Sequence, residues 1–569
     1  MPTREEVLAA LTQQGPFELV VDESAGYPLR VYKNAPQSFR EVLIGSRAHG
    51  DKTFAVYGRE TLSYAEHFRK AGALAHYLQK AGVRRGDRVA LGMRNYPEWS
   101  IAFFACQAIG AIVVALNAWW TGGELAFALA DSAPSTLIID GERLERLREK
   151  LPEMNLKAVI VARRGGAGSG GVDFEEAVGA GADELPDAEV GPQDLATILY
   201  TSGTTGNPKG AMATHRNHMT NLMNTMLGGM VVRMVAGLPL EADPAAPQPA
   251  SLQTFPFFHI GGLTGLYISV AIGAKLAMMY KWDPVEAVRL VQEHGLTGVS
   301  GVPIVVRQLL ETASNMGADL SSVIGVTSGG APVPPDLIRR IGSQFQQRAA
   351  PGNGYGLTET TSAVIVNSGM DYLMRPDSIG RPVVTADVRI VGEDGEDIAE
   401  GKIGEIWIRG PNVIPGYWLN PQATEAAFGG GWFRSGDLGY RDPEGFYHVV
   451  DRIKDVIIRG GENVYCAEVE ATLLEHPAVR DAALIGLPHP DWGEEVAAIL
   501  QVRSEDLCEE MAEDIRASLE GRLARFKIPT AVRLTDLELP RTATGKILKR
   551  ELRQRYFAEP ARSGEAAHA

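Results

Sequence analysis

The sequence predicts an α/β protein with a large N-terminal domain of stacked α/β sheets and a smaller, mobile α+β domain at the C-terminal end. Three observations support this class. The chain has 569 residues, more than one hydrophobic core ordinarily organises. Hydrophobic residues make up 45% of the chain and charged residues 22%, which is enough apolar material to offset chain entropy. Helical patterns alternate with short β-branched runs, as in parallel α/β units.

The alternation begins with helical patterns at residues 64–81 and 97–109 and strand patterns at 88–92 and 111–116. An amphipathic stretch at 284–294 predicts a further helix. The other strands expected in this part are at 136–140, 158–162, 276–279, 298–301 and 323–328. So many strands predict two or more sheets.

One long apolar stretch, residues 101–116, raises the question of a membrane span. It contains Gln107 and Gly110 and falls short of the roughly 18 uninterrupted apolar residues that a span needs. We therefore expect a buried helix that runs into a strand, and no stable membrane insertion.

The pattern changes after residue 381, where shorter alternating segments at 387–394 and 405–409 suggest antiparallel strands or a small β-barrel-like subdomain. From residue 451 a compact α+β pattern follows, with helices expected at 467–475 and 509–525 and strands at 481–486, 495–502 and 531–534. These changes divide the chain into an N-terminal domain, 1–450, and a C-terminal domain, 451–569. Residues 231–249 are expected to be a surface insertion, and residues after 560 a loose tail.

Charge and cysteine content exclude several classes of protein. The net charge of −15 disfavours nucleic acid as the main partner, because binding it needs clustered Lys and Arg. Cys106, Cys466 and Cys508 are widely spaced, so they support neither a disulfide framework nor a thiolate metal site. The first 15 residues lack the apolar segment of a secretory signal. A cytoplasmic location is expected.

The strongest chemical signal is a Ser/Thr/Gly-rich loop that follows an apolar strand expected at residues 196–200. Glycines let backbone amides approach an oxyanion, hydroxyls donate further hydrogen bonds, and a lysine adds charge for phosphate oxygens. No Lys and Ser or Thr directly follow the second loop glycine, so this is not a Walker loop. A flexible linker is the alternative interpretation, but the strand before the loop favours phosphate binding. The residues concerned are Thr201, Ser202, Gly203, Thr204, Thr205, Gly206 and Lys209.

Five further motifs follow this loop in a fixed order. They are Gly-Gly-Ala-Pro at 329–332, Gly-Tyr-Gly-Leu-Thr-Glu at 354–359, Trp-Phe-Arg-Ser-Gly-Asp at 432–437, Asp-Arg-Ile-Lys-Asp with Gly-Gly-Glu-Asn-Val at 451–464, and Pro-Arg-Thr-Ala-Thr-Gly-Lys at 540–546. Together the six motifs span most of the chain. They resemble the adenylate-forming superfamily, which includes acyl-CoA synthetases, firefly-type luciferases and nonribosomal peptide adenylation domains. The resemblance implies that ATP activates a carboxylic acid as its adenylate.

The resemblance also implies a role for each motif. The Ser/Thr/Gly-rich loop holds the β- and γ-phosphates, Asp437 accepts the ribose hydroxyls, and Tyr355 lies against the adenine. Beyond the loop, the implied ATP- and AMP-binding residues are Gly329, Gly330, Ala331, Pro332, Asn353, Gly354, Tyr355, Gly356, Leu357, Thr358, Asp437, Arg452 and Lys546.

Lys546, Glu359 and His259 are the expected catalytic residues. Attack of a carboxylate on the α-phosphorus of ATP brings two anions together, and Lys546 can neutralise charge on both. Glu359, with Thr204, is the expected Mg²⁺ site, since Mg²⁺ takes only one or two carboxylates beside substrate phosphates. His259 resembles the histidine that lines the acyl pocket and is not assigned as a general base. The structural alternatives are that Lys546 is an ordinary solvated lysine, that Glu359 caps a helix and that His259 is a core histidine.

CoA is the expected acyl acceptor, because no carrier-protein segment follows the small domain. Gly460 and Gly461 allow a pantetheine arm to pass close to the backbone, and the C-terminal domain is expected to rotate about a hinge at Asp451 and Lys454 between the two half-reactions. The expected cofactors and partners are therefore ATP, Mg²⁺, CoA and a carboxylic acid, with a homodimer left open.

The acyl pocket is expected to be apolar, which suits a fatty, alkyl or aryl acid. Near residues 257–262 the chain lacks the aspartate that would hold the ammonium of an amino acid. The expected pocket residues are Phe258, His259, Val302, Gly329 and Gly354.

Three other functions are compatible with parts of the sequence to different degrees. An acyl-AMP ligase that loads a carrier protein stays open. A nucleotide-binding oxidoreductase would use the glycine run at 166–171, which matches G-x-G-x-x-G but precedes only a short, poor helix pattern. A serine hydrolase is disfavoured because the sequence contains no G-x-S-x-G motif.

Cys466 stands where the family usually has proline and is expected to be an unactivated thiol.

Overall fold

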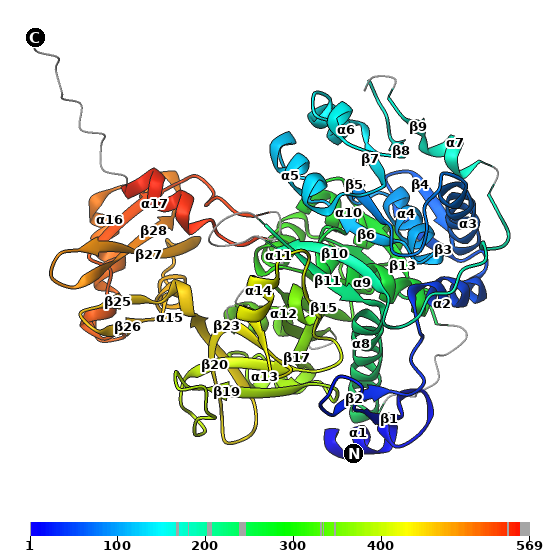
Figure 1. Ribbon diagram of the computed structural model, residues 1–569. Helices are drawn as coiled ribbons and strands as arrows, with labels where there is room; N and C mark the ends of the chain where they lie inside the picture. The colour runs from blue at the N-terminus through cyan, green and yellow to red at the C-terminus, as the bar shows by residue number, and fades with distance from the viewer. Residues whose placement is uncertain are drawn as a thin grey trace, which may run out of the picture. The chain divides into compact units, whose positions relative to one another are not determined.

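The structure is a computed structural model of the chain, drawn in Figure 1. It describes residues 2–166, 170–179, 181–201, 208–237, 246–330, 333, 335–345, 349–542 and 545–557. Contacts divide the chain into two compact units. The first unit contains Met1–Arg389, Trp407–Ser435 and Gly445–Tyr447, and the second contains Ile390–Ile406, Gly436–Glu444 and His448–Ala569.

The first unit contains an eight-stranded sheet in the order β21-β11-β10-β6-β5-β7-β8-β9. Strands β10, β6, β5, β7, β8 and β9 are parallel, whereas β11 and β21 run antiparallel to their neighbours. The strands are β5 (Arg88–Gly92), β6 (Ile112–Ala115), β7 (Thr136–Asp140), β8 (Ala158–Ala162), β9 (Val172–Asp173), β10 (Leu195–Thr201), β11 (Lys209–Thr214) and β21 (Gly416–Tyr417).

A nine-stranded sheet in the order β18-β17-β16-β15-β14-β12-β13-β3-β4 lies in the same unit. Its six central strands, from β16 to β3, are parallel. The strands are β3 (Thr53–Tyr57), β4 (Glu60–Ser63), β12 (Ala250–Gln253), β13 (Lys275–Met278), β14 (Gly298–Gly301), β15 (Gly325–Gly329), β16 (Ala350–Leu357), β17 (Ser362–Ser368) and β18 (Arg381–Pro382). The predicted α/β class is therefore confirmed.

Helices complete the core of this unit. Helix α4 (Pro97–Ala108) is buried along almost its whole length and leads directly into β6, as predicted for the apolar stretch. No helix among the described residues is long and apolar enough to cross a membrane. The other helices that matter for the site are α3 (Tyr64–Lys80), α5 (Gly122–Ser132), α8 (His215–Val235), α9 (Ile260–Ile272), α10 (Pro284–His294), α11 (Pro303–Met316), α12 (Pro335–Gln344) and α14 (Pro421–Ala427).

The first residues of the chain also belong to the folded unit. Helix α1 (Arg4–Thr12) begins with a capping box at Thr3, and a hairpin of β1 (Leu19–Asp22) and β2 (Leu29–Tyr32) follows. Val7, Phe17 and Tyr32 from this segment pack against apolar residues of α8.

A five-stranded sheet follows β18, in the order β19-β20-β23-β22 with β24 paired to β23. The strands are β19 (Asp387–Val391), β20 (Gly404–Arg409), β22 (Phe428–Gly429), β23 (Trp432–Arg441) and β24 (Tyr447–Arg452). Among the described residues the path is open, so the strands expected as a small β-barrel-like subdomain form a sheet without closing on themselves.

The C-terminal part of the second unit contains another five-stranded sheet, β26-β25-β28-β27 with β29 paired to β28. The expected helix at 509–525 is wrong at its end. Helix α16 stops at Ala517, and a turn follows in which Gly521 takes φ +78°, a conformation that L side chains disfavour. The elements are β25 (Ile457–Arg459), β26 (Glu462–Val464), α15 (Cys466–Leu473), β27 (Asp481–His489), β28 (Gly493–Gln501), α16 (Glu509–Ala517), β29 (Ala531–Thr535) and α17 (Lys549–Phe557).

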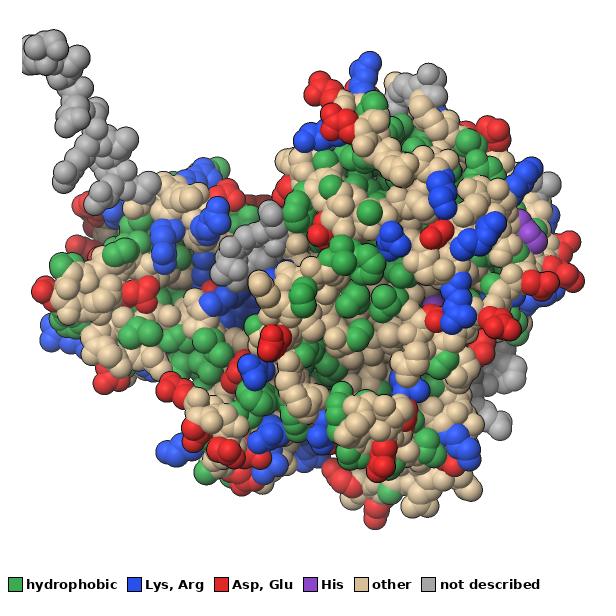
Figure 2. Space-filling view, viewed as in Figure 1, with side chains coloured by type: hydrophobic (Ala, Val, Ile, Leu, Met, Phe, Trp, Pro, Cys, Tyr) green, Lys and Arg blue, Asp and Glu red, His purple; other side chains and the backbone are tan. Residues whose placement is uncertain are grey.

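Charged side chains of both signs are interspersed over the face in Figure 2.

Candidate functional site

The predicted phosphate loop connects two antiparallel strands. Strand β10 ends at Thr201 and β11 begins at Lys209, and these two residues pair directly. A Cβ atom on Gly210 would lie 2.8 Å from a side-chain carbon of Ile198, so only glycine fits here. Ser202, Gly203, Thr204, Thr205 and Gly206 lie outside the described residues.

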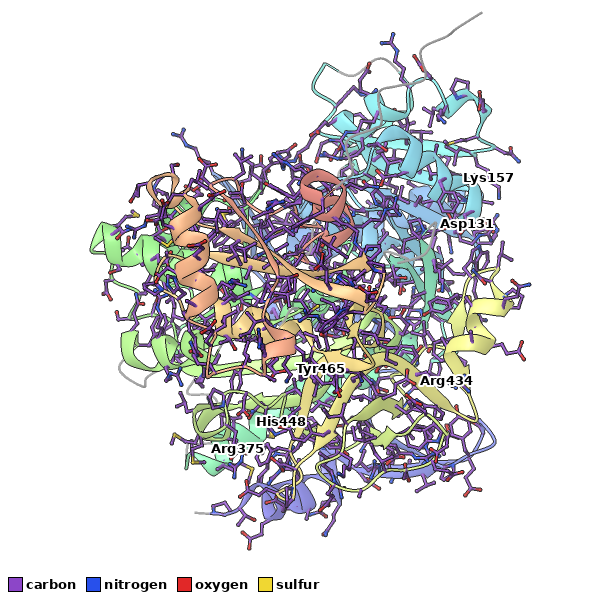
Figure 3. The ribbon with its side chains drawn as sticks, turned by 90° about the vertical axis from the view of Figure 1, so that its left-hand side faces the viewer. Asp131, Lys157, Arg375, Arg434, His448 and Tyr465 are labelled. Carbon is purple, nitrogen blue, oxygen red and sulfur yellow. The ribbon has the colours of Figure 1, made fainter. Side chains whose placement is uncertain are left out.

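A distant segment holds the base of this loop. Trp418 N donates to Gly210 O at 2.7 Å, and Trp418 Nε1 donates to the carbonyl of Asp131 at 3.2 Å. The Tyr200 hydroxyl donates to the Asp131 carboxylate at 2.6 Å. Asp131, labelled in Figure 3, lies on α5, so this helix and the segment after β21 both hold the end of the strand that leads into the loop.

Glu359, the predicted metal ligand, lies at the carboxyl end of β16 in a short 3-10 turn, Thr358–Thr360. Glu359 is 9% exposed, and its carboxylate accepts a hydrogen bond from the Tyr417 hydroxyl at 2.8 Å. Among the described residues it forms no ion pair and has no other side-chain donor. A nearly buried carboxylate with one neutral donor still needs a cation, and Mg²⁺ beside substrate phosphates suits such a site.

Tyr417 was missed from sequence. Its ring lies under the Lys209 ammonium, with Nζ 5.2 Å from the ring centroid. Burial, and then the Glu359 carboxylate, raise the pKa of Tyr417 well above that of a free phenol. The hydroxyl therefore stays protonated and can donate to Glu359.

The predicted acyl-pocket residues lie at one edge of the nine-stranded sheet, where its parallel strands end. The His259 Nδ1 atom accepts from Gly261 N at 3.2 Å and caps α9. A Cβ atom on Gly330 would lie 3.6 Å from Val302 and 3.8 Å from Phe255. Gly330 thus lies near both Val302 and Phe255, a residue that was not predicted from the sequence.

Phe255 and His259 form a parallel aromatic pair, with ring centroids 6.3 Å apart and planes inclined by 20°. Asn95 fixes the segment that carries them, because its Nδ2 donates to Phe255 O at 2.9 Å and its Oδ1 accepts from Phe257 N at 2.9 Å. Phe258, predicted in the pocket, is buried at 8% exposure.

The segment predicted to border the adenine is formed by the ends of β15 and β16. Gly329 pairs with Gly354, and a Cβ atom on Gly329 would lie 3.1 Å from Gly354 O. Tyr355 is half-buried one residue further on. The other predicted residues here are Asn353, Gly356, Leu357 and Thr358, all described, whereas Ala331 and Pro332 lie outside the described residues.

In the second unit, the predicted ribose aspartate and hinge arginine lie together. Arg452 Nε is 3.1 Å from Asp437 Oδ1, and Asp437 is 5% exposed. Asp451 accepts from Ala467 N at 3.4 Å, and burial raises its pKa. Burial, followed by the charge of Arg452, lowers the pKa of the Lys454 ammonium.

Gly460 and Gly461 form the turn between β25 and β26. Their φ angles are +62° and +86°, a region that favours glycine. Nothing lies within 4 Å of a Cβ atom built on Gly461, which leaves its surface open as the predicted CoA role requires.

Lys546 lies in an exposed turn. Thr542 N donates to Lys546 O at 2.8 Å, and Lys546 N donates to Thr542 Oγ1 at 3.1 Å. Gly545, just before it, takes φ +81°. The turn thus fixes the backbone of Lys546 while its side chain is exposed.

A charged group near this turn was not predicted. Lys549 Nζ lies 2.8 Å from Glu470 Oε1. Burial alone would lower the pKa of Lys549, but Glu470 and neighbouring anionic groups outweigh it and raise that pKa. Cys466, beside this pair, donates to Asp455 O at 3.0 Å, and burial raises its pKa to about 12, in agreement with an unactivated thiol.

Residues 167–169 of the glycine run at 166–171 lie outside the described residues, and the described residues that follow lack the long helix that a dinucleotide fingerprint opens. Gly171 leads into β9, and the helix that follows, α7 (Phe174–Val178), is only 5 residues long. Among the described residues, no group of three His, Cys, Asp or Glu side chains could hold a metal ion.

Comparisons with known proteins give a family and its relatives. A family model described as AMP-binding enzyme matches residues 45–418, and one described as AMP-binding enzyme C-terminal domain matches residues 468–546. The chain is 38% identical over 505 residues to feruloyl-CoA synthase of Amycolatopsis sp., covering 89% of this chain and 96% of that one. It is 34% identical to indoleacetate–CoA ligase of Aromatoleum aromaticum, covering 88% and 95%.

Solved structures agree. O-succinylbenzoate coenzyme A synthetase from Bacillus subtilis, in complex with ATP and magnesium ion, matches with a TM-score of 0.75 at 29% identity. The match covers 91% of this chain and 99% of that one.

Proposed function

This chain belongs to the AMP-binding enzyme family and is an ATP-dependent, AMP-forming acid–CoA ligase, and we propose that its acid is an aryl acid. The alignment that carries this spans 96% of feruloyl-CoA synthase. The parallel rings of Phe255 and His259 at the expected pocket support an aromatic substrate, because aromatic rings stack in offset or edge-on contacts.

The residue roles form the second part of the proposal. ATP lies with its β- and γ-phosphates at the loop that β10 and β11 close, and Lys209 supplies positive charge there. Glu359 and Thr204 are the residues that would hold Mg²⁺, which neutralises phosphate charge when it is bound with ATP. His259 and Phe255 orient the acid so that its carboxylate faces the α-phosphate.

Lys546 is proposed to neutralise the charge that builds up as the carboxylate oxygen attacks and pyrophosphate leaves. CoA is the proposed acceptor in the second half-reaction, in which its sulfur attacks the acyl carbon and AMP leaves. The Gly460–Gly461 turn is proposed to line the path of the pantetheine arm.

The functional division of the chain is proposed to lie near Asp451, with residues 1–450 holding ATP and the acid and residues 451–569 carrying Lys546. A rotation about Asp451 to Lys454 would exchange the group presented to the adenylate. The physical rationale for this rotation is that adenylation and thioester formation need different protein groups beside the acyl adenylate.

A panel of acids tests the proposal. Ferulate, indole-3-acetate and alkanoates of similar length should be assayed for pyrophosphate release, with and without CoA. We expect aryl acids to give the highest kcat/KM, with acyl-CoA and AMP as products. Faster turnover of alkanoates would contradict the aryl assignment, and adenylate formation without any CoA thioester would instead favour a carrier-loading ligase.

A further inference from the structure

Tyr417 has its backbone fixed beside the start of β11. Tyr417 pairs with Ala211 in the β11–β21 ladder, and its backbone N donates to Thr424 Oγ1 at 3.0 Å. The next amide, of Trp418, donates to Gly210 O at 2.7 Å. These contacts leave the Tyr417 side chain little freedom to change position.

The side chain of Tyr417 makes two polar contacts through different parts. Its hydroxyl donates to Glu359 Oε1 at 2.8 Å, and its ring face lies 5.2 Å from Lys209 Nζ. Tyr417 is 7% exposed, and its ring packs edge-on against Phe428, with centroids 5.8 Å apart. One rigid side chain therefore contacts both Lys209, the lysine of the phosphate loop, and the Glu359 carboxylate after β16.

The contact with Glu359 joins a buried tyrosine hydroxyl to a charged acceptor. A buried hydroxyl needs only a neutral acceptor such as a backbone carbonyl. Here the acceptor is a carboxylate at 9% exposure that forms no ion pair among the described residues. Because Lys209 faces the ring of Tyr417, the charge of Glu359 is left for a cation that arrives with a ligand.

From these contacts, and resting on the proposed function, we propose that Tyr417 is a positioning residue that couples the phosphate loop to Glu359. Its hydroxyl holds one carboxylate oxygen and so orients the other toward the metal-bound nucleotide. Its ring holds the Lys209 ammonium at the end of the loop through a cation–π contact. The two charged groups that face the triphosphate are thereby set by one side chain.

Tyr417→Phe separates the two contacts, because it removes the hydroxyl and keeps the ring. The measurement is Mn²⁺ affinity by electron paramagnetic resonance in the presence of α,β-methylene-ATP, which needs neither acid nor CoA. We expect Mn²⁺ to bind about tenfold more weakly, the lower end of what loss of an outer-shell partner costs. Affinity for α,β-methylene-ATP in EDTA should stay within about twofold, since the cation–π contact persists.

Tyr417→Leu removes the ring as well. We expect this variant to show the same loss of Mn²⁺ affinity and, in EDTA, about fivefold weaker binding of α,β-methylene-ATP, as loss of a cation–π contact predicts. A merely structural role for Tyr417 would lower the melting temperature of both variants and leave the Mn²⁺ affinity of Tyr417→Phe unchanged.

Tyr372→Phe is the matched control. Tyr372 is also buried, and its hydroxyl has no hydrogen-bond partner among the described residues, so Mn²⁺ affinity should not change. Unchanged Mn²⁺ affinity in Tyr417→Phe, with normal binding by the wild type, would overturn this inference alone. A wild-type protein that binds no α,β-methylene-ATP would overturn the proposed function together with it.

Discussion

Lys209 and Lys546 are the two lysines proposed to face the phosphates of ATP, and their surroundings are opposite. Lys209 lies at the end of a paired strand, half-buried over the ring of Tyr417. Lys546 lies in an exposed turn that constrains its backbone. A group that must stay in place throughout a reaction is suited to the first environment, and a group that must be withdrawn after one step is suited to the second.

The largest expected effect comes from Lys546→Ala. It should slow adenylation by at least about 10²-fold, the loss typical of removing one electrostatic stabiliser, and still transfer acyl groups from a supplied adenylate to CoA. Pyrophosphate exchange and thioester formation measure the two steps separately. Arg550→Ala removes an exposed cation from the same segment and should leave both steps unchanged. Equal loss of both steps in Lys546→Ala would show that this lysine does not act in adenylation alone.

Lys549→Ala is the next test, three residues further along. Lys549 pairs with Glu470, with side-chain exposures of 26% and 19%. Removing one partner leaves a largely buried charge, and since both groups retain some solvent we expect a loss of about 2 kcal/mol in unfolding free energy. Chemical denaturation measures it. The double variant with Glu470→Gln should recover part of the loss, and additive losses would argue against the pair.

Gly461→Leu tests the open surface of the β25–β26 turn. We expect thioester formation to fall by about tenfold, the effect of overpacking a close approach, while pyrophosphate exchange is spared. Gly521→Leu is matched, because Gly521 also has a positive φ and nothing within 4 Å of its Cβ position. A collapse of pyrophosphate exchange in Gly461→Leu would contradict the CoA role of this turn.

The smallest expected effect concerns the stability of the first unit in acid, through a histidine whose pKa is set mainly by burial. His215, which follows β11, accepts a hydrogen bond from Phe39 N at 3.2 Å, and burial lowers its pKa to about 4. An unfolded histidine titrates near about 6.5, so the unfolded chain binds the proton first. The stabilisation is therefore complete above that pH and is lost as pH falls toward 4.

His215→Asn keeps a hydrogen-bond acceptor for Phe39 N and removes the titration. Between pH 7 and pH 5.5 the unfolding free energy of the wild type should fall by about 1 kcal/mol more than that of the variant. Denaturation at each pH measures this difference. Parallel pH profiles for the two proteins would show that His215 is not buried in its neutral form.

Local sequence signals predicted the parts of the site that lie within one motif. The strand leading into the phosphate loop, expected at 196–200, is present as β10, and a glycine turn does precede Lys546, whereas β11 and its pairing with β10 were not predicted. Tyr417 could not be found in this way, because β21 has only two residues and a strand that short shows no alternation. Its partner Glu359 is 58 residues away, and a single sequence does not reveal such pairing.

The same limit applies to Phe255 and to Lys549. Phe255 follows β12 in a segment with several aromatic residues, and only the neighbouring strands determine which ring lies beside Gly330. Lys549 resembles any basic residue at the start of a helix until Glu470 is placed beside it. For helix α16 the sequence predicted too much structure rather than too little, because the apolar pattern continues beyond Gly521, where the chain turns.

The hydrogen bonds by which Trp418 holds the base of the phosphate loop have a consequence for synthesis on the ribosome. Trp418 Nε1 reaches Asp131 across 287 residues of sequence, so the nascent chain makes strands β10 and β11 long before the segment that fastens them. At roughly 5–20 residues per second, translation leaves this hairpin unfastened for many seconds. Glu359 is made 58 residues before Tyr417, so the carboxylate proposed to bind the metal also waits for its hydrogen-bond donor, and the proposed site is complete only after this segment has been synthesised.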